Sequence, residues 1–258
     1  MRCFDNFPHF INEGESSFNR GGERQAISTQ FEMNERKMDK FGKLKAVLWD
    51  MDGVLLDSQS AHFIAFREVL AKYEFEVTNA AFKPTFGMTN EQVVRQVSGE
   101  RFSDKEVALI CREKDEQFRQ VIAKEAVFLA GVEDWLAEFK QAGIHQALAS
   151  SGSWENIYTI LDALKARPYF DAVVSGEDCA SKPDPAVFLR AAEKLEVSPS
   201  TCLVIEDSIA GIQAAAAASM KCLAVTTTYP LEKLPQTDLV LPDLAALKVE
   251  MLVELFEA

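Results

Sequence analysis

The sequence predicts an α/β protein in which a doubly wound, Rossmann-like parallel sheet carries an inserted helical cap. Short apolar runs without clean alternation recur along the chain, and helical stretches separate most of them. Such runs suit strands that are buried on both faces, and strand–helix alternation implies a parallel sheet. A mostly helical stretch of about 65 residues follows the first run, and 258 residues with 48% apolar content suffice for a core and a smaller domain.

Six predicted strands define the core, which we place at residues 42–59 and 127–258. Most of the strands are rich in leucine or valine, and several of them end in a polar residue. The expected strands are residues 45–50, 145–150, 171–175, 201–207, 221–225 and 238–241, and the helices between them are residues 133–142, 154–165, 185–195 and 208–218.

Residues 60–126 interrupt this alternation and are expected to form the cap. They contain helical patterns and no strand between them. The charged run 112–119 (REKDEQFR) is expected to be a solvated helix face. The expected cap helices are residues 61–73, 90–97, 103–114 and 115–126.

Residues 1–41 have a different composition, rich in polar residues and glycine and without an apolar period. We expect a flexible extension. Arg2 is not followed by an apolar stretch, so no signal peptide is predicted. One hypothesis is that the native protein starts at Met38, which mass spectrometry of natively expressed protein would decide.

The formal net charge of −13 disfavours nucleic acid and anionic lipid as partners. It also repels phosphate esters, so a phosphate site would need its own local positive charge. No apolar run approaches the length of a membrane span. The five cysteines are scattered and have no metal-binding spacing, which is typical of a reducing cytosol. Two of them, Cys202 and Cys222, lie in apolar runs that indicate core positions. We therefore expect a cytoplasmic monomer with neither nucleic-acid nor membrane partners.

Polar side chains follow four of the predicted strands. Loops at the carboxyl ends of parallel strands meet at one crevice, so we expect these residues to converge. Several carboxylates in one place need a cation, and oxygen ligands suit Mg²⁺. A carboxylate near such an ion can attack phosphorus, while a second acid transfers protons. The candidate residues are Asp50, Asp52, Ser150, Ser151, Lys182, Glu206 and Asp207.

Four segments in order resemble the motifs of the haloacid dehalogenase superfamily. They are DMDGVLLDS (50–58), ALASS (147–151), SKPDP (181–185) and VIEDS (204–208). The position of the cap resembles the subgroup with a small helical cap, which includes β-phosphoglucomutase and many sugar-phosphate phosphatases. The resemblance covers residues 45 to about 245 and implies the same core fold.

The resemblance also implies a role for each matching residue. Asp50 would be the nucleophile and a metal ligand, and Asp52 the general acid and base, with its main-chain carbonyl on the metal. Lys182 would hold phosphoryl oxygens together with the serines that end the second strand, Ser150 and Ser151. Asp207 would complete the Mg²⁺ site, with Glu206 supporting it directly or through water.

Cap residues leave the reaction open between a phosphatase and a mutase. His62 stands where β-phosphoglucomutase has a histidine that orients the acid/base, although a lone histidine on a helix is more often packing or surface. Gly87 could belong to a substrate-specificity loop or simply precede a helix. Asn90 replaces the arginine with which the mutase binds a second phosphate, and Trp154 replaces an asparagine of the mutase.

We therefore expect a Mg²⁺-dependent phosphatase that hydrolyses a small phosphorylated metabolite, such as a sugar phosphate, through an aspartyl phosphate. The alternative is a sugar-phosphate mutase of the β-phosphoglucomutase type. A non-catalytic binding protein on the same fold is disfavoured, because every residue that the chemistry needs is present.

Overall fold

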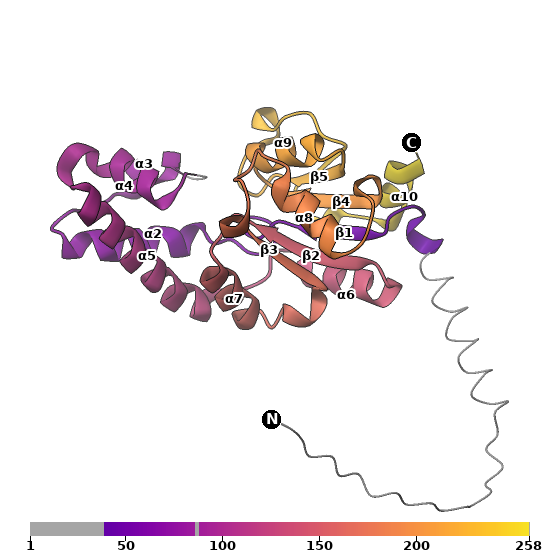
Figure 1. The fold of residues 1–258 in the computed structure, drawn as a ribbon, viewed down its shortest axis with the longest axis horizontal. Helices are drawn as coiled ribbons and strands as arrows, with labels where there is room; N and C mark the ends of the chain where they lie inside the picture. Colours follow the sequence, from indigo (N-terminus) through magenta and orange to yellow (C-terminus); the bar gives the residue numbers. More distant parts are fainter. Residues whose placement is uncertain (1–38, 86–87, 258) are drawn as a thin grey trace, which may run out of the picture.

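The computed structural model describes residues 39–85 and 88–257 and confirms the predicted α/β fold (Figure 1). Six strands form one parallel sheet in the order β3-β2-β1-β4-β5-β6. The first strand is therefore central, between the second and the fourth. The strands are β1 (Ala46–Trp49), β2 (His145–Ser150), β3 (Ala172–Ser175), β4 (Cys202–Glu206), β5 (Lys221–Val225) and β6 (Leu239–Leu241).

The register of β1 with its neighbours determines where the site lies. Trp49, the last residue of β1, pairs with Leu148 of β2 and with Ile205 of β4. The residues that follow these positions in all three strands therefore emerge at the same edge of the sheet. This edge carries the polar residues that the sequence places at strand ends.

Helices cover both faces of the sheet. One apolar cluster joins one face of the sheet to α6 (Val132–Ala142), α7 (Trp154–Ala163) and α10 (Val249–Glu257). A second cluster joins the other face to α8 (Ala186–Lys194) and α9 (Ile209–Ala217), and it contains Cys202 and Cys222, which confirms their predicted burial. The sequence analysis did not anticipate α10, which carries buried Leu252 and Phe256.

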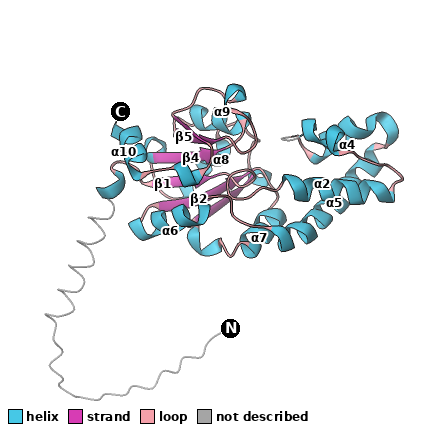
Figure 2. Ribbon diagram, turned by 180° about the vertical axis from the view of Figure 1, so that it is seen from behind, coloured by secondary structure: helices cyan, strands magenta, loops and turns pink. Residues whose placement is uncertain are grey.

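The cap region forms a helical lobe beside the sheet (Figures 1 and 2). It consists of α2 (Gln59–Lys72), α3 (Asn79–Phe82), α4 (Asn90–Ser98) and α5 (Asp104–Glu125), which share an apolar cluster of their own. The prediction of two helices at 103–114 and 115–126 is wrong, because α5 runs continuously through both. Its start is stabilised by a capping box, in which Ser103 and Glu106 satisfy each other's backbone N–H groups.

Short 3-10 turns connect these elements. They are η1 (Asp39–Phe41), η2 (Lys83–Thr85), η3 (Gly99–Arg101), η4 (Arg167–Tyr169), η5 (Gly176–Asp178), η6 (Pro199–Thr201), η7 (Leu231–Lys233) and η8 (Leu244–Ala246).

The first of these turns corrects the predicted boundary at residue 42. Phe41 is fully buried, with its ring centroid 5.4 Å from that of Phe139 and 6.5 Å from that of Trp135. The folded core therefore begins before residue 42, because an aromatic side chain of this size packs under α6. The rest of the expected extension, residues 1–38, lies outside the described residues. None of the described helices combines the length and the apolar character that crossing a membrane requires.

Candidate active site

Lys182 and Asp50 lie at the centre of the carboxyl edge of the sheet. Asp50 directly follows β1, and its main-chain N–H donates to the carbonyl of Ile205 in β4 (3.0 Å). The Lys182 ammonium donates to the Asp50 carboxylate, to Glu206 Oε1 (2.8 Å) and to the carbonyl of Ala149 in β2 (3.1 Å). Its side chain is only 6% exposed. One lysine thus bridges the ends of the three central strands.

Three carboxylates surround this lysine. Oxygen atoms of Asp50, Glu206 and Asp207 lie within 4.8 Å of one another, and all three residues are buried. Burial raises the pKa of Asp50 well above its usual value, against the opposing charge of Lys182. Burial and the Glu206 charge raise the pKa of Asp207 to about 7. The cluster therefore has less positive charge than its carboxylates need when all are ionised.

That excess of buried negative charge fits a divalent cation with oxygen ligands. For Lys182, burial lowers the pKa, but the charges of Asp50 and Glu206 outweigh it and raise the pKa overall. Lys182 therefore stays protonated and supplies one positive charge to the three carboxylates. A hard ion such as Mg²⁺ is the group that the donor set of this site suits.

Glu206 is fully buried and supports the surrounding backbone. Its Oε2 accepts from the N–H groups of Asp207 (2.9 Å) and Ser208 (2.8 Å) and from the Ser208 hydroxyl (2.9 Å). The Ser208 hydroxyl in turn accepts from the N–H of Gly211 (3.0 Å), which makes Ser208 the N-cap of α9. Glu206 therefore fixes both Lys182 and the start of α9.

Asp52 lies on the turn that follows Asp50, where its carboxylate accepts from the buried Ser58 hydroxyl. Burial raises the pKa of Asp52, although the Ser58 hydrogen bond and the Lys114 charge oppose this. The intervening Gly53 has φ +83°, and a Cβ there would lie 1.9 Å from Asp207 Oδ2. This turn therefore requires glycine for both its backbone and the space beside Asp207.

The two serines that end β2 differ in their surroundings. Ser150 is buried, and its hydroxyl accepts from the N–H of Gly152 (3.0 Å). Ser151 is exposed. They are the two residues that follow Ala149, whose carbonyl binds Lys182, so the structure brings them to the same edge as Asp50.

The predicted cap residues have different surroundings from one another. His62 stacks on Phe118, with ring centroids 4.1 Å apart and an interplanar angle of 13°. Burial, followed by the charge of Lys114, lowers the pKa of His62 well below its usual value, so the ring is neutral near pH 7. Asn90 opens α4 and donates to both carboxylate oxygens of Asp115 (3.0 Å each). Gly87 lies outside the described residues.

Lys114 is a residue that the sequence analysis missed. The prediction of a solvated face at 112–119 is wrong for Lys114 and Phe118, each of which is 1% exposed. Ile110, Lys114, Phe118 and Ile122 recur every four residues and are all buried in one stripe of α5. A lysine in register with three apolar residues is the pattern that identifies it in the sequence.

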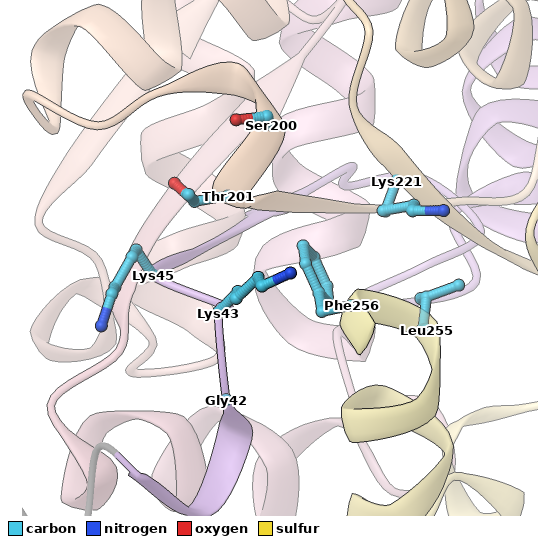
Figure 3. Close-up of a pocket in the computed structure, with 8 residues that line it drawn as sticks. All are labelled: Gly42, Lys43, Lys45, Ser200, Thr201, Lys221, Leu255 and Phe256. Carbon is cyan, nitrogen blue, oxygen red and sulfur yellow. The ribbon is translucent and has the colours of Figure 1, made fainter. Parts of the chain in front are cut away.

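A cavity of about 500 Å³ lies elsewhere, at the opposite end of the strands (Figure 3). It is lined by residues that precede β1 and β4 and by α10. Figure 3 shows Lys43 reaching toward Phe256, whereas the amino groups of Lys45 and Lys221 point in other directions. Lys221 pairs instead with Asp238 (3.1 Å). The lysines therefore do not converge on a common centre.

Comparison with known proteins agrees with this geometry. The model of the haloacid dehalogenase-like hydrolase family matches residues 47–225, which include Asp50, Lys182 and Asp207. The chain belongs to the haloacid dehalogenase-like hydrolases. The parallel sheet and the acids at its carboxyl edge are thus those of a known family of hydrolases.

Relatives within this family differ in their reactions. The chain is 30% identical to β-phosphoglucomutase of Bacillus subtilis, over 83% of this chain and 96% of that one. It is also 30% identical to the fructose-1-phosphate phosphatase YqaB of Escherichia coli, over 72% and 98%. Equal identity to a mutase and to a phosphatase leaves the choice to the residues of the site.

Two further similarities concern a longer protein and a solved structure. The chain is 36% identical to the chloroplastic protein SUPPRESSOR OF QUENCHING 1 of Arabidopsis thaliana, over 74% of this chain but only 18% of that protein. The crystal structure of CbbY from Rhodobacter sphaeroides in complex with phosphate superposes with a TM-score of 0.72, at 27% identity over 79% and 96% of the two chains.

Proposed function

We propose that this hydrolase is a phosphatase that uses Mg²⁺ and a covalent aspartyl phosphate to hydrolyse a small phosphorylated metabolite. The observation that carries the proposal is the contact between Asp50 and Lys182 beside Asp207 and Glu206 at one sheet edge. A nucleophilic carboxylate and a fixed cation within one hydrogen bond can receive a phosphoryl group between them.

The proposed reaction has two steps, and Asp52 transfers a proton in each of them. An Asp50 oxygen bonds to phosphorus while the phosphorus–ester bond breaks, and Asp52 donates its proton to the departing oxygen. Asp52 then takes a proton from water as the water oxygen bonds to phosphorus, and phosphate leaves Asp50. Burial raises the pKa of Asp52, which favours the protonated acid that the first step needs. Lys182 and Ser150 bind the phosphoryl oxygens in both steps.

Asp50, Asp207 and the main-chain carbonyl of Asp52 are suited to hold Mg²⁺, which would neutralise charge on the phosphoryl group when bound. Glu206 supports this site from behind, because its Oε2 is already engaged by three donors and its Oε1 by Lys182.

Features of the cap and of the core helix α7 favour a phosphatase over a mutase. A bisphosphate intermediate needs strong positive charge at its non-reacting end, and the amide of Asn90 supplies none. Trp154 is turned toward the loop after β3, where its N–H groups donate to Glu177 (3.0 Å) and Asp178 (3.4 Å). His62 stacks on Phe118, while Ser58 orients Asp52 instead. Similarity to the fructose-1-phosphate phosphatase supports a sugar phosphate as the substrate class.

The test is release of inorganic phosphate from a panel of sugar phosphates with Mg²⁺, compared between the wild type and Asp50→Asn. The variant removes the nucleophile, so we expect kcat to fall by at least about 10³-fold. The matched control is Asp57→Asn, because Asp57 is exposed and its side chain accepts from the N–H of Gln59, a bond that asparagine can also accept.

Three results would contradict the proposal. Substantial turnover by Asp50→Asn would exclude the covalent step. Conversion of β-glucose 1-phosphate to glucose 6-phosphate with little phosphate release would instead support the mutase. Absence of phosphate release from every sugar phosphate would refute the substrate class.

A further inference from the structure

The cap contains an ion pair between a buried lysine, Lys114, and a partly exposed aspartate, Asp115. The Lys114 ammonium donates to Asn90 Oδ1 (3.0 Å) and to Asp115 Oδ1 (3.2 Å). The Asn90 amide donates to both oxygens of Asp115 (3.0 Å each). We call Asn90, Lys114 and Asp115 the cap triad. Each member is bonded to the other two.

The lysine of the cap triad lies on the side of the cap that meets the core. Its ammonium is 5.0 Å from the ring centroid of Phe118, on which His62 stacks. Burial raises the pKa of Asp52 and lowers the pKa of Lys114, and the charge of each residue opposes the shift of the other. Among the described cap residues, Lys114 is therefore a buried cation whose charge acts on Asp52, the residue beside the nucleophile.

The charge of this cation is already compensated. Asp115 pairs with Lys114 and is itself held by two donors from Asn90, so the cap triad as a whole is neutral. A second phosphate on the substrate would have to compete with the Asp115 carboxylate for Lys114 and would lie beside that carboxylate's own charge. Two like charges at such a distance in a partly buried site repel. A neutral hydroxyl meets no such penalty and can accept from the lysine.

We infer that Asp115, by neutralising Lys114, makes this site selective for sugar monophosphates and against bisphosphates. The inference rests on the proposed phosphatase function. It further specifies that the non-reacting end of the substrate carries no second phosphate. Asp115 is a positioning residue here, since it acts through Lys114.

The first test needs only the wild type with matched substrates, fructose 1-phosphate against fructose 1,6-bisphosphate and glucose 6-phosphate against glucose 1,6-bisphosphate. We expect kcat/KM to favour the monophosphate by about tenfold or more, mainly through KM. Equal or better use of both bisphosphates would overturn the inference while leaving the phosphatase proposal intact. No phosphate release from any of the four would count against sugar phosphates as the proposed substrate class, and the inference would fall with it.

The second test is Asp115→Asn, which removes the carboxylate that pairs with Lys114. We expect the monophosphate preference to fall by about fivefold or more, with a lower KM for the bisphosphates. The preference is a ratio within one protein sample, so partial loss of folded protein cancels. An unchanged preference would overturn the inference.

Two further variants separate charge from structure. Glu116→Gln removes the same charge from the next residue, which is exposed on α5, and should leave the preference within about twofold of the wild type. Asp115→Glu keeps the charge and should retain the preference. If Glu116→Gln shifted the preference as far as Asp115→Asn, net charge rather than the cap triad would be the cause, and the inference would be wrong.

Discussion

At the scale of single residues, the site depends on the close approach of the Gly53 backbone to the Asp207 side chain. Gly53 has φ +83° and no room for a Cβ beside Asp207. We expect Gly53→Ala to displace Asp207 and to lower kcat/KM by about 10²-fold or more, with weaker apparent Mg²⁺ affinity. Phosphatase assays across a Mg²⁺ titration measure both effects.

Gly99→Ala is the matched control for that substitution. Gly99 also has a positive φ (+61°), but a Cβ there meets nothing within 4 Å. Both variants therefore incur backbone strain, and only one disturbs the site. Equal losses of activity in the two variants would mean that strain, not the contact with Asp207, is responsible.

At the scale of elements, α5 connects the cap to the core. Arg119 on α5 donates to Asn156 Oδ1 on α7 (3.1 Å), and Asn156 is buried. Because this bond carries a charged donor, we expect Arg119→Ala to destabilise the protein by about 1–2 kcal/mol and to lower Tm by roughly 2–6 °C. Hydrogen exchange of α5 and α7 amides should also become faster.

Arg112→Ala on the same helix provides the comparison, since Arg112 is exposed two turns earlier. It should change Tm by less than about 1 °C. If both arginine variants lowered Tm equally, the contact between α5 and α7 would not be the reason.

At the scale of the whole molecule, the acids of the site couple stability to pH. Burial and the Glu206 charge raise the pKa of Asp207 to about 7. Between the unfolded value of about 4 and about 7, the folded protein keeps a proton that the unfolded chain has lost, so this group makes the metal-free protein less stable as pH rises. In EDTA, Asp207→Asn should therefore raise Tm above pH 7 by several degrees, and the gain should vanish towards about pH 4.

Added Mg²⁺ should reverse the order of these two proteins. It binds the ionised acids of the folded wild type and so raises its Tm, whereas the variant has lost a ligand. Thermal unfolding across pH, with and without Mg²⁺, measures this. A Tm difference that is independent of pH would contradict the raised pKa of Asp207.

The sequence by itself determined the sheet and the residues at its carboxyl edge. Apolar runs that end in Asp50 and in Glu206 and Asp207 predict strands of a parallel sheet, and a parallel sheet necessarily brings such ends together. Lys182 is 132 residues from Asp50 in the chain, yet its place beside the strand ends was predictable for the same reason. The roles of these residues in catalysis stay predictions.

Tertiary structure alone decided the chemistry of the cap. The charged run 112–119 indicates a solvated helix, and the four-residue spacing of Lys114 with apolar residues is only a hint of burial. The packing of α5 against Phe66 of α2 and its contact with Asn90 of α4 show that Lys114 is a buried cation. The local sequence likewise did not determine the burial of Phe41 or the continuity of α5. The physical reason is that burial depends on partners from distant segments, whereas the carboxyl edge of a parallel sheet follows from strand order.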